Sequence, residues 1–78
     1  MTRHEFLVEK IEAVSHAKTN GLAPVEKTFS HRGMCATFRY NQLGALDVEV
    51  FVGECRLFRA PANLVLTAMQ NGYTIKEG

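Results

Sequence analysis

The stretch MCATFRYNQLGALDVEVFV, residues 34–52, decides the fold because it contains two strand patterns around a tight turn. Both halves alternate apolar with more polar residues and are rich in branched and aromatic side chains. That composition and period are typical of half-buried β-strands. The connection Asn41–Gly44 is so short that it joins antiparallel neighbours. We therefore predict an antiparallel hairpin with strands over 34–40 and 45–52.

Two further strands are predicted on either side of this hairpin. Residues 25–29 precede it and residues 54–59 follow it, and both segments are rich in branched and aromatic side chains. Turn signals that include Gly33 and Gly53 separate these segments from the hairpin. The middle of the chain is therefore predicted to be an antiparallel β-meander of about four strands.

A helix is predicted before the meander. Thr2, with Glu5 three residues later, forms a capping-box pattern in which each side chain satisfies an amide of the other residue. Asn20-Gly21 suits the end of this helix, and Pro24 prevents its continuation. The apolar residues that recur at helical spacing in between are Leu7, Ile11 and Val14.

A second helix is predicted at about residues 61–71, with Pro61 in its first turn and Asn71-Gly72 at its end. Residues 73–76 indicate a short final strand that returns to the sheet. The order of helix, four strands, helix and short strand predicts an α+β fold. We expect a single small domain over residues 1–78, with both helices on one face of the sheet.

Composition limits the classes of function. The chain has 78 residues, a formal net charge of +1, 46% hydrophobic and 22% charged residues. This length fits one domain, and the small charge argues against a general nucleic-acid clamp. No apolar run approaches the roughly 20 residues that span a bilayer, so we predict no membrane association. Two cysteines without a secretory signal favour reduced thiols in the cytoplasm.

His31, Cys35 and Cys55 are the residues that would hold a metal or form a catalytic dyad. Zinc sites usually show two pairs of closely spaced ligands, whereas this chain has one loose pair and a distant Cys55. The chain also lacks a nucleophile elbow and a glycine-rich phosphate loop. We therefore predict no metal, no cofactor and no enzyme activity, with both cysteines as ordinary sheet residues.

The second helix carries the most unusual signal, because no residue from Ala60 to Ile75 is charged. A solvated helix usually carries Lys and Glu. An uncharged polar face with apolar shoulders suits a protein–protein contact, where desolvating a charge is costly. The alternative is that the first helix and the last strand simply cover this helix. Under the first interpretation the contact patch contains Val65, Thr67, Met69 and Gln70.

Arginines and aromatics of the strands form a second candidate surface, containing Arg39, Phe51 and Arg56. If both arginines point away from the helices, strand alternation places Asp47 and Glu49 on the same face. Cross-strand charge pairs would then account for the arginines. Phe58 shares this face in a regular register, but a bulge near Gly53 would turn it into the core.

The same surface also raises the alternative of nucleic-acid binding, through phosphate contacts and base stacking. The residues for that function are Arg32, Arg39, Arg56 and Phe51. The prediction we favour is a non-enzymatic protein-binding module, a small cytoplasmic regulator or inhibitor such as phages use. It would dock on another protein, with a homodimer as one form, and nothing in the sequence identifies the partner.

Overall fold

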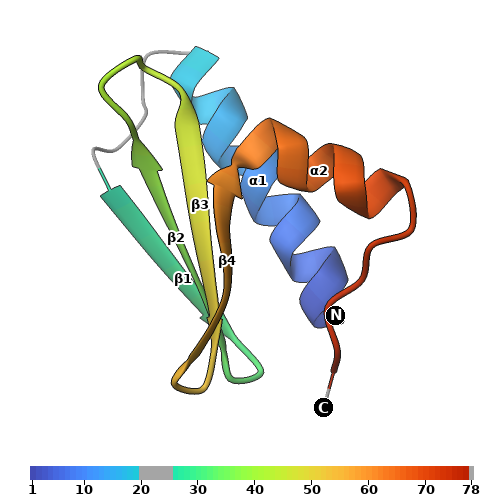
Figure 1. The fold of residues 1–78 in the computed structure, drawn as a ribbon. Helices are drawn as coiled ribbons and strands as arrows, with labels where there is room; N and C mark the ends of the chain where they lie inside the picture. The colour runs from blue at the N-terminus through green and yellow to red at the C-terminus, as the bar shows by residue number, and fades with distance from the viewer. Residues whose placement is uncertain (20–25, 78) are drawn as a thin grey trace.

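The structure, a computed structural model, describes residues 1–19 and 26–77 (Figure 1). One helix precedes four strands, and a second helix follows them, so the predicted α+β fold is confirmed. The predicted helix end at Asn20-Gly21, Pro24 and the first residue of the first predicted strand lie outside the described residues. The elements are α1 (Arg3–Thr19), β1 (Glu26–His31), β2 (Met34–Tyr40), β3 (Leu46–Val52), β4 (Cys55–Pro61) and α2 (Ala62–Gln70).

The four strands form one antiparallel sheet in the order β1-β2-β3-β4. Each strand therefore pairs with its neighbour in the chain, as the short turns predict. Phe38 of β2 lies opposite Val48 of β3, and Arg39 lies opposite Asp47. The sheet thus separates an apolar face from a charged face.

Both helices pack on the apolar face, and the core lies between them and the sheet (Figure 1). Phe38, Val48 and Val50 are completely or almost completely buried there. None of the described helices combines the length and the apolar character that crossing a membrane requires. The buried core residues are Leu7, Ile11, Val14, Met34, Ala36, Phe38, Val48, Val50, Ala62, Val65, Met69 and Ile75.

Helix α1 begins with the predicted capping box. The backbone amide of Glu5 donates to the Thr2 hydroxyl over 3.0 Å, and the amide of Thr2 donates to the Glu5 carboxylate over 2.9 Å. The hydrogen bond from the Thr2 backbone, then that from its side chain, lower the pKa of Glu5. Two amides that helix geometry leaves unpaired are thereby satisfied.

The predicted final strand over 73–76 is wrong, because residues 73–77 follow α2 without joining the sheet. Gly72 has a φ of +106°, and the Tyr73 amide donates back to the Ala68 carbonyl over 3.0 Å. This turn closes α2 and reverses the chain. The Arg3 guanidinium then holds the Lys76 carbonyl at 2.6 Å, on the helix side of the molecule.

A bulge interrupts β4. Val50 pairs with Phe58, whereas its neighbour Phe51 pairs with Arg56, so Leu57 has no partner in β3. An extra residue in one strand changes the face to which the following side chains point. Phe58 therefore lies on the helix side, as expected if the strand bulged, and the bulge lies at Leu57 rather than at Gly53.

Candidate functional site

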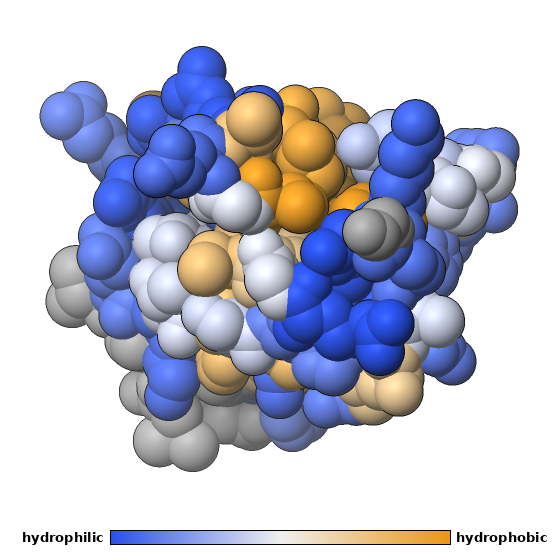
Figure 2. All heavy atoms as spheres, turned by 90° about the horizontal axis from the view of Figure 1, so that it is seen from below, coloured by the Kyte–Doolittle hydropathy of each residue, from blue (hydrophilic) through white to orange (hydrophobic). Residues whose placement is uncertain are grey.

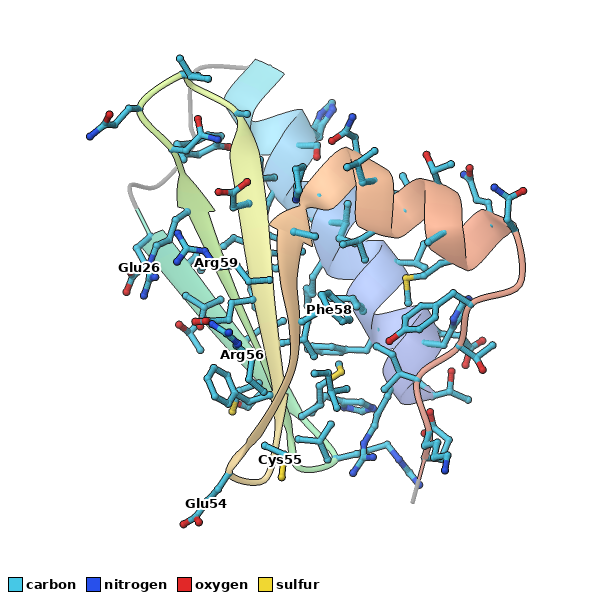
Figure 3. The ribbon with its side chains drawn as sticks, viewed as in Figure 1. Glu26, Glu54, Cys55, Arg56, Phe58 and Arg59 are labelled. Carbon is cyan, nitrogen blue, oxygen red and sulfur yellow. The ribbon has the colours of Figure 1, made fainter. Side chains whose placement is uncertain are left out.

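The charged face of the sheet carries the second predicted patch. Figure 3 shows Glu26, Arg56 and Arg59 on the side away from the helices and Phe58 on the opposite side. Arg39 donates from Nε to the Glu26 carboxylate, and this hydrogen bond raises the pKa of Arg39. Arg56 of β4 donates to the Glu49 carboxylate over 3.3 Å. Cross-strand pairing with the predicted acidic residues therefore forms between Arg56 and Glu49, whereas Arg39 pairs with Glu26 of β1 and not with Asp47.

The charges of this face balance. Its acidic residues are Glu26, Asp47 and Glu49, and its basic residues are Arg39, Arg56 and Arg59. The uncharged side chains of this face include the Thr28–Thr37 pair, whose oxygens are 3.0 Å apart, and Phe51. A phosphate backbone would therefore meet no net positive charge here.

The four residues of the nucleic-acid interpretation do not form one cluster. Phe51 is half-buried on the charged face, opposite Arg56. Arg32 lies in the β1–β2 turn, where its carbonyl accepts from Arg3 and its guanidinium forms an ion pair with Glu77 at 3.4 Å. These contacts hold Arg32 beside the N-terminal end of α1, apart from the charged face.

The histidine and the two cysteines also lie apart. The His31 ring stacks on Phe6, with centroids 4.6 Å apart, and its Nε2 lies 2.8 Å from the Met1 carbonyl oxygen. Cys35 lies beside Ser30 with a sulfur–oxygen distance of 3.2 Å, whereas Cys55 pairs with Val52. Within residues 1–19 and 26–77, no three His, Cys, Asp or Glu residues are grouped as metal ligands.

Two of the four residues predicted for the patch on α2 are buried rather than exposed. Val65 and Met69 are only 6% and 5% exposed, because together with Ala62 they form the stripe that packs into the core. Thr67 and Gln70 are exposed, and the Thr67 hydroxyl donates to the Asn63 carbonyl over 2.9 Å. The alternative interpretation, in which other parts of the protein cover α2, therefore holds for the stripe of Ala62, Val65 and Met69.

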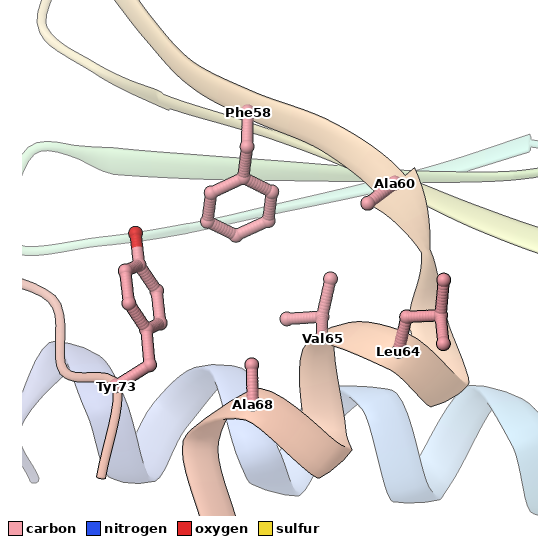
Figure 4. A pocket seen from close by; sticks show the side chains of 6 residues that line it. All are labelled: Phe58, Ala60, Leu64, Val65, Ala68 and Tyr73. Atoms are coloured by element: carbon pink, nitrogen blue, oxygen red, sulfur yellow. The ribbon is translucent and has the colours of Figure 1, made fainter. Parts of the chain in front are cut away.

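An apolar groove lies between β4 and the outer side of α2. Figure 4 shows Phe58 and Ala60 of β4 on one wall, and residues of α2 on the other. The cavity has a volume of about 260 Å³. Tyr73 closes one end, where its ring meets Phe58 edge-to-face with centroids 6.1 Å apart. We call this the edge groove, and its lining residues are Phe58, Ala60, Leu64, Val65, Ala68 and Tyr73.

A second hollow continues from Tyr73 along β4 toward the β3–β4 turn, and its lining includes Val52, Leu57 and Ile75. Several large apolar side chains remain open to solvent around the two hollows. Leu64 is 59% exposed, and Leu57 and Tyr73 are each 43% exposed. Figure 2, which views the molecule from below, shows its most hydrophobic patch near the top of the view, with hydrophilic side chains on either side.

The edge groove lies beside backbone that has no strand partner. β4 is the last strand of the sheet, and among the described strands it pairs with β3 alone. Alternate residues of an edge strand direct their N–H and C=O groups outward. The site therefore combines apolar walls with backbone donors and acceptors.

Five of the six lining residues of the edge groove fall in the charge-free segment 60–75. Of the four residues predicted for the contact patch on α2, only Val65 also lines this groove. Leu64 and Ala68 are four residues apart and form a second apolar stripe beside Val65 and Met69. The four-residue spacing of Leu64 and Ala68 was the sequence pattern from which this exposed apolar stripe of α2 could have been predicted. Phe58 was missed because its orientation depends on the bulge.

Comparison with known proteins finds no matching family model, no similar curated protein and no similar solved structure.

Proposed function

We propose that this chain is a non-enzymatic protein-binding module that docks on another protein through the edge groove. The observation that carries the proposal is an apolar groove of about 260 Å³ beside an unpaired sheet edge. Leu57, Leu64 and Tyr73 are exposed around it and supply the apolar surface of such a contact. Exposed apolar surface with a polar rim is characteristic of protein interaction sites.

The energetics favour a protein partner. Fully burying a large apolar side chain stabilises a complex by roughly 1.5–3 kcal/mol, so a few such side chains supply a substantial driving force. No charged residue lies between Ala60 and Ile75, so the α2 wall of the groove loses no hydrated charge on binding. The charged face offers less, because two of its three arginines, Arg39 and Arg56, already pair with the carboxylates of Glu26 and Glu49.

Affinity capture from cell extract tests this proposal with two matched variants. Leu64→Glu places a charge at the groove, whereas Leu43→Glu makes the same change at a 93% exposed residue of the β2–β3 turn. We expect wild type and Leu43→Glu to retain the same protein and Leu64→Glu to lose it. Thermal unfolding confirms that both variants are folded. Retention that survives Leu64→Glu would contradict the proposal.

A further inference from the structure

The edge groove and the unpaired edge of β4 lie side by side, so one extended segment can engage both. Strands in a sheet are about 4.8 Å apart, and a strand added to β4 would continue the sheet beside the groove. In this type of recognition the main-chain hydrogen bonds contribute affinity, and pockets for alternate side chains contribute specificity. Both parts are present at β4.

We propose, building on the proposed function, that β4 binds an extended segment of another protein as a fifth strand. The segment has apolar side chains at alternate positions and acidic side chains between them. Its apolar side chains enter the edge groove, and its acidic side chains lie beside Arg56 and Arg59. The helix side of β4 explains the apolar positions of the segment, and the charged face of β4 explains its acidic positions.

The helix side of β4 determines the apolar half. Phe58 and Ala60 point from β4 into the groove, with Leu64 and Ala68 of α2 opposite them (Figure 4). Side chains at alternate positions of a neighbouring strand point to the same face of the sheet. The added segment would therefore place every second side chain against these apolar walls.

The charged face of β4 determines the acidic half. Arg56 and Arg59 both point away from the helices (Figure 3), and β4 itself has no acidic residue. Arg56 is paired with Glu49, whereas Arg59 forms no ion pair with any carboxylate in the described part of the chain. Opposite charges on directly facing strand residues are favourable. Acidic side chains on the added segment would therefore complement this edge.

Charge also argues against a second copy of this chain as the occupant. Pairing of β4 with β4 of another copy would bring two Arg56 and two Arg59 side chains onto one face of the seam. Like charges on facing strands are destabilising, and basic residues on edge strands oppose self-pairing. A partner with acidic residues avoids this repulsion.

Nuclear magnetic resonance with synthetic peptides tests the proposal on the full chain. The probe is the capped peptide Glu-Val-Glu-Val-Glu-Val-Glu, and the matched control replaces every Glu with Lys. We expect the acidic peptide to shift the amides of β4 and protect them from hydrogen exchange, with no effect on the other edge strand, β1. N-methylation of alternate peptide amides should abolish binding. Arg59→Glu should weaken the acidic peptide about fivefold or more.

Several results would overturn the proposal. One is unchanged exchange of the β4 amides at millimolar acidic peptide, and another is equal binding of the N-methylated or lysine peptide. Concentration-dependent protection of β4 without peptide would assign the edge to a second copy. The capture experiment with Leu64→Glu tests docking through the groove itself, and its outcome does not depend on any of these peptide results. Failure of strand addition is thus distinguishable from failure of the proposed function.

Discussion

The guanidinium of Arg3 donates two hydrogen bonds, of 2.9 and 2.6 Å, to the backbone carbonyl of Arg32. It donates a third, of 2.6 Å, to the carbonyl of Lys76, while its own amide donates to the Glu77 carboxylate. One side chain, only 9% exposed, thus joins the start of α1, the β1–β2 turn and the C-terminal segment. Its hydrogen bonds to Lys76 and Glu77 fix the C-terminal segment beside the start of α1.

Arg3→Ala should destabilise the fold by about 2–4 kcal/mol, because buried hydrogen bonds from a charged donor are lost and carbonyls remain unsatisfied. That is a large part of the roughly 4–12 kcal/mol expected for a domain of this length. Urea unfolding measures the change. Arg32→Gly is the control, because it keeps the accepting carbonyl, relieves a non-glycine φ of +51° and removes only an exposed ion pair with Glu77. If Arg3→Ala were as stable as wild type, Arg3 would not be what holds α1, the β1–β2 turn and the C-terminal segment together.

Glu5→Gln should destabilise the protein in a pH-dependent way. The folded state lowers the pKa of Glu5, so the contribution of its carboxylate is present above the ordinary value of 4.5. That contribution is lost as the pH falls through the lower, folded pKa. The difference in melting temperature between wild type and variant should therefore be largest near neutral pH and should vanish in acid. Glu12→Gln, at an exposed position inside α1, serves as the comparison. A difference independent of pH would contradict the cap assignment.

Met69→Ala should destabilise the fold by about 2–5 kcal/mol, because it removes a buried side chain and leaves a cavity. Met69→Asp should unfold the protein, so this residue cannot serve as a selective test of docking. Chemical denaturation compares these variants with Gln70→Ala, which alters the exposed neighbour in the same helix turn. Native stability of Met69→Asp would mean that the side chain is not part of the core.

Single-stranded DNA or RNA should not bind wild type in a salt-dependent manner, because three carboxylates balance three arginines on the charged face. Replacing Glu26 and Glu49 with Gln removes the ion-pair partners of Arg39 and Arg56. This double variant should gain oligonucleotide retention at low salt and lose it as salt rises. Fluorescence anisotropy measures both proteins. Steep salt-dependent binding by wild type would support the nucleic-acid alternative instead.

Much of the fold could be predicted from short-range pattern. The predicted strand over 34–40 coincides with β2, and the Thr2–Glu5 capping box forms as expected. These features depend on residues two to four positions apart, so the chain itself displays them. Alternation within each strand was sufficient to predict that Arg39, Arg56 and Glu49 share one face, but not that Arg39 pairs with Glu26 of β1 while Arg56 pairs with Glu49.

The candidate site was only partly predictable. The charge-free segment 60–75 contains most of the groove lining, but Val65 and Met69 were expected to be exposed and are buried. The final strand over 73–76 was expected because its residues suit a strand, yet Arg3 holds this segment through a contact between residues 73 positions apart. A local sequence pattern does not show which distant residue will bind such a segment, or toward which side of the molecule it will be held.

The sequence by itself determined the order of helices and strands, the antiparallel pairing and the two faces of the sheet, because these follow from periodicity and turn chemistry. Only the tertiary structure decided which apolar stripe of α2 is buried. The stripe with Val65 and the stripe with Leu64 are both apolar and uncharged, so the choice depends on the space between α1 and the sheet. The bulge at Leu57 completes that choice, since it turns Phe58 under α2 and leaves the groove beside the edge of β4.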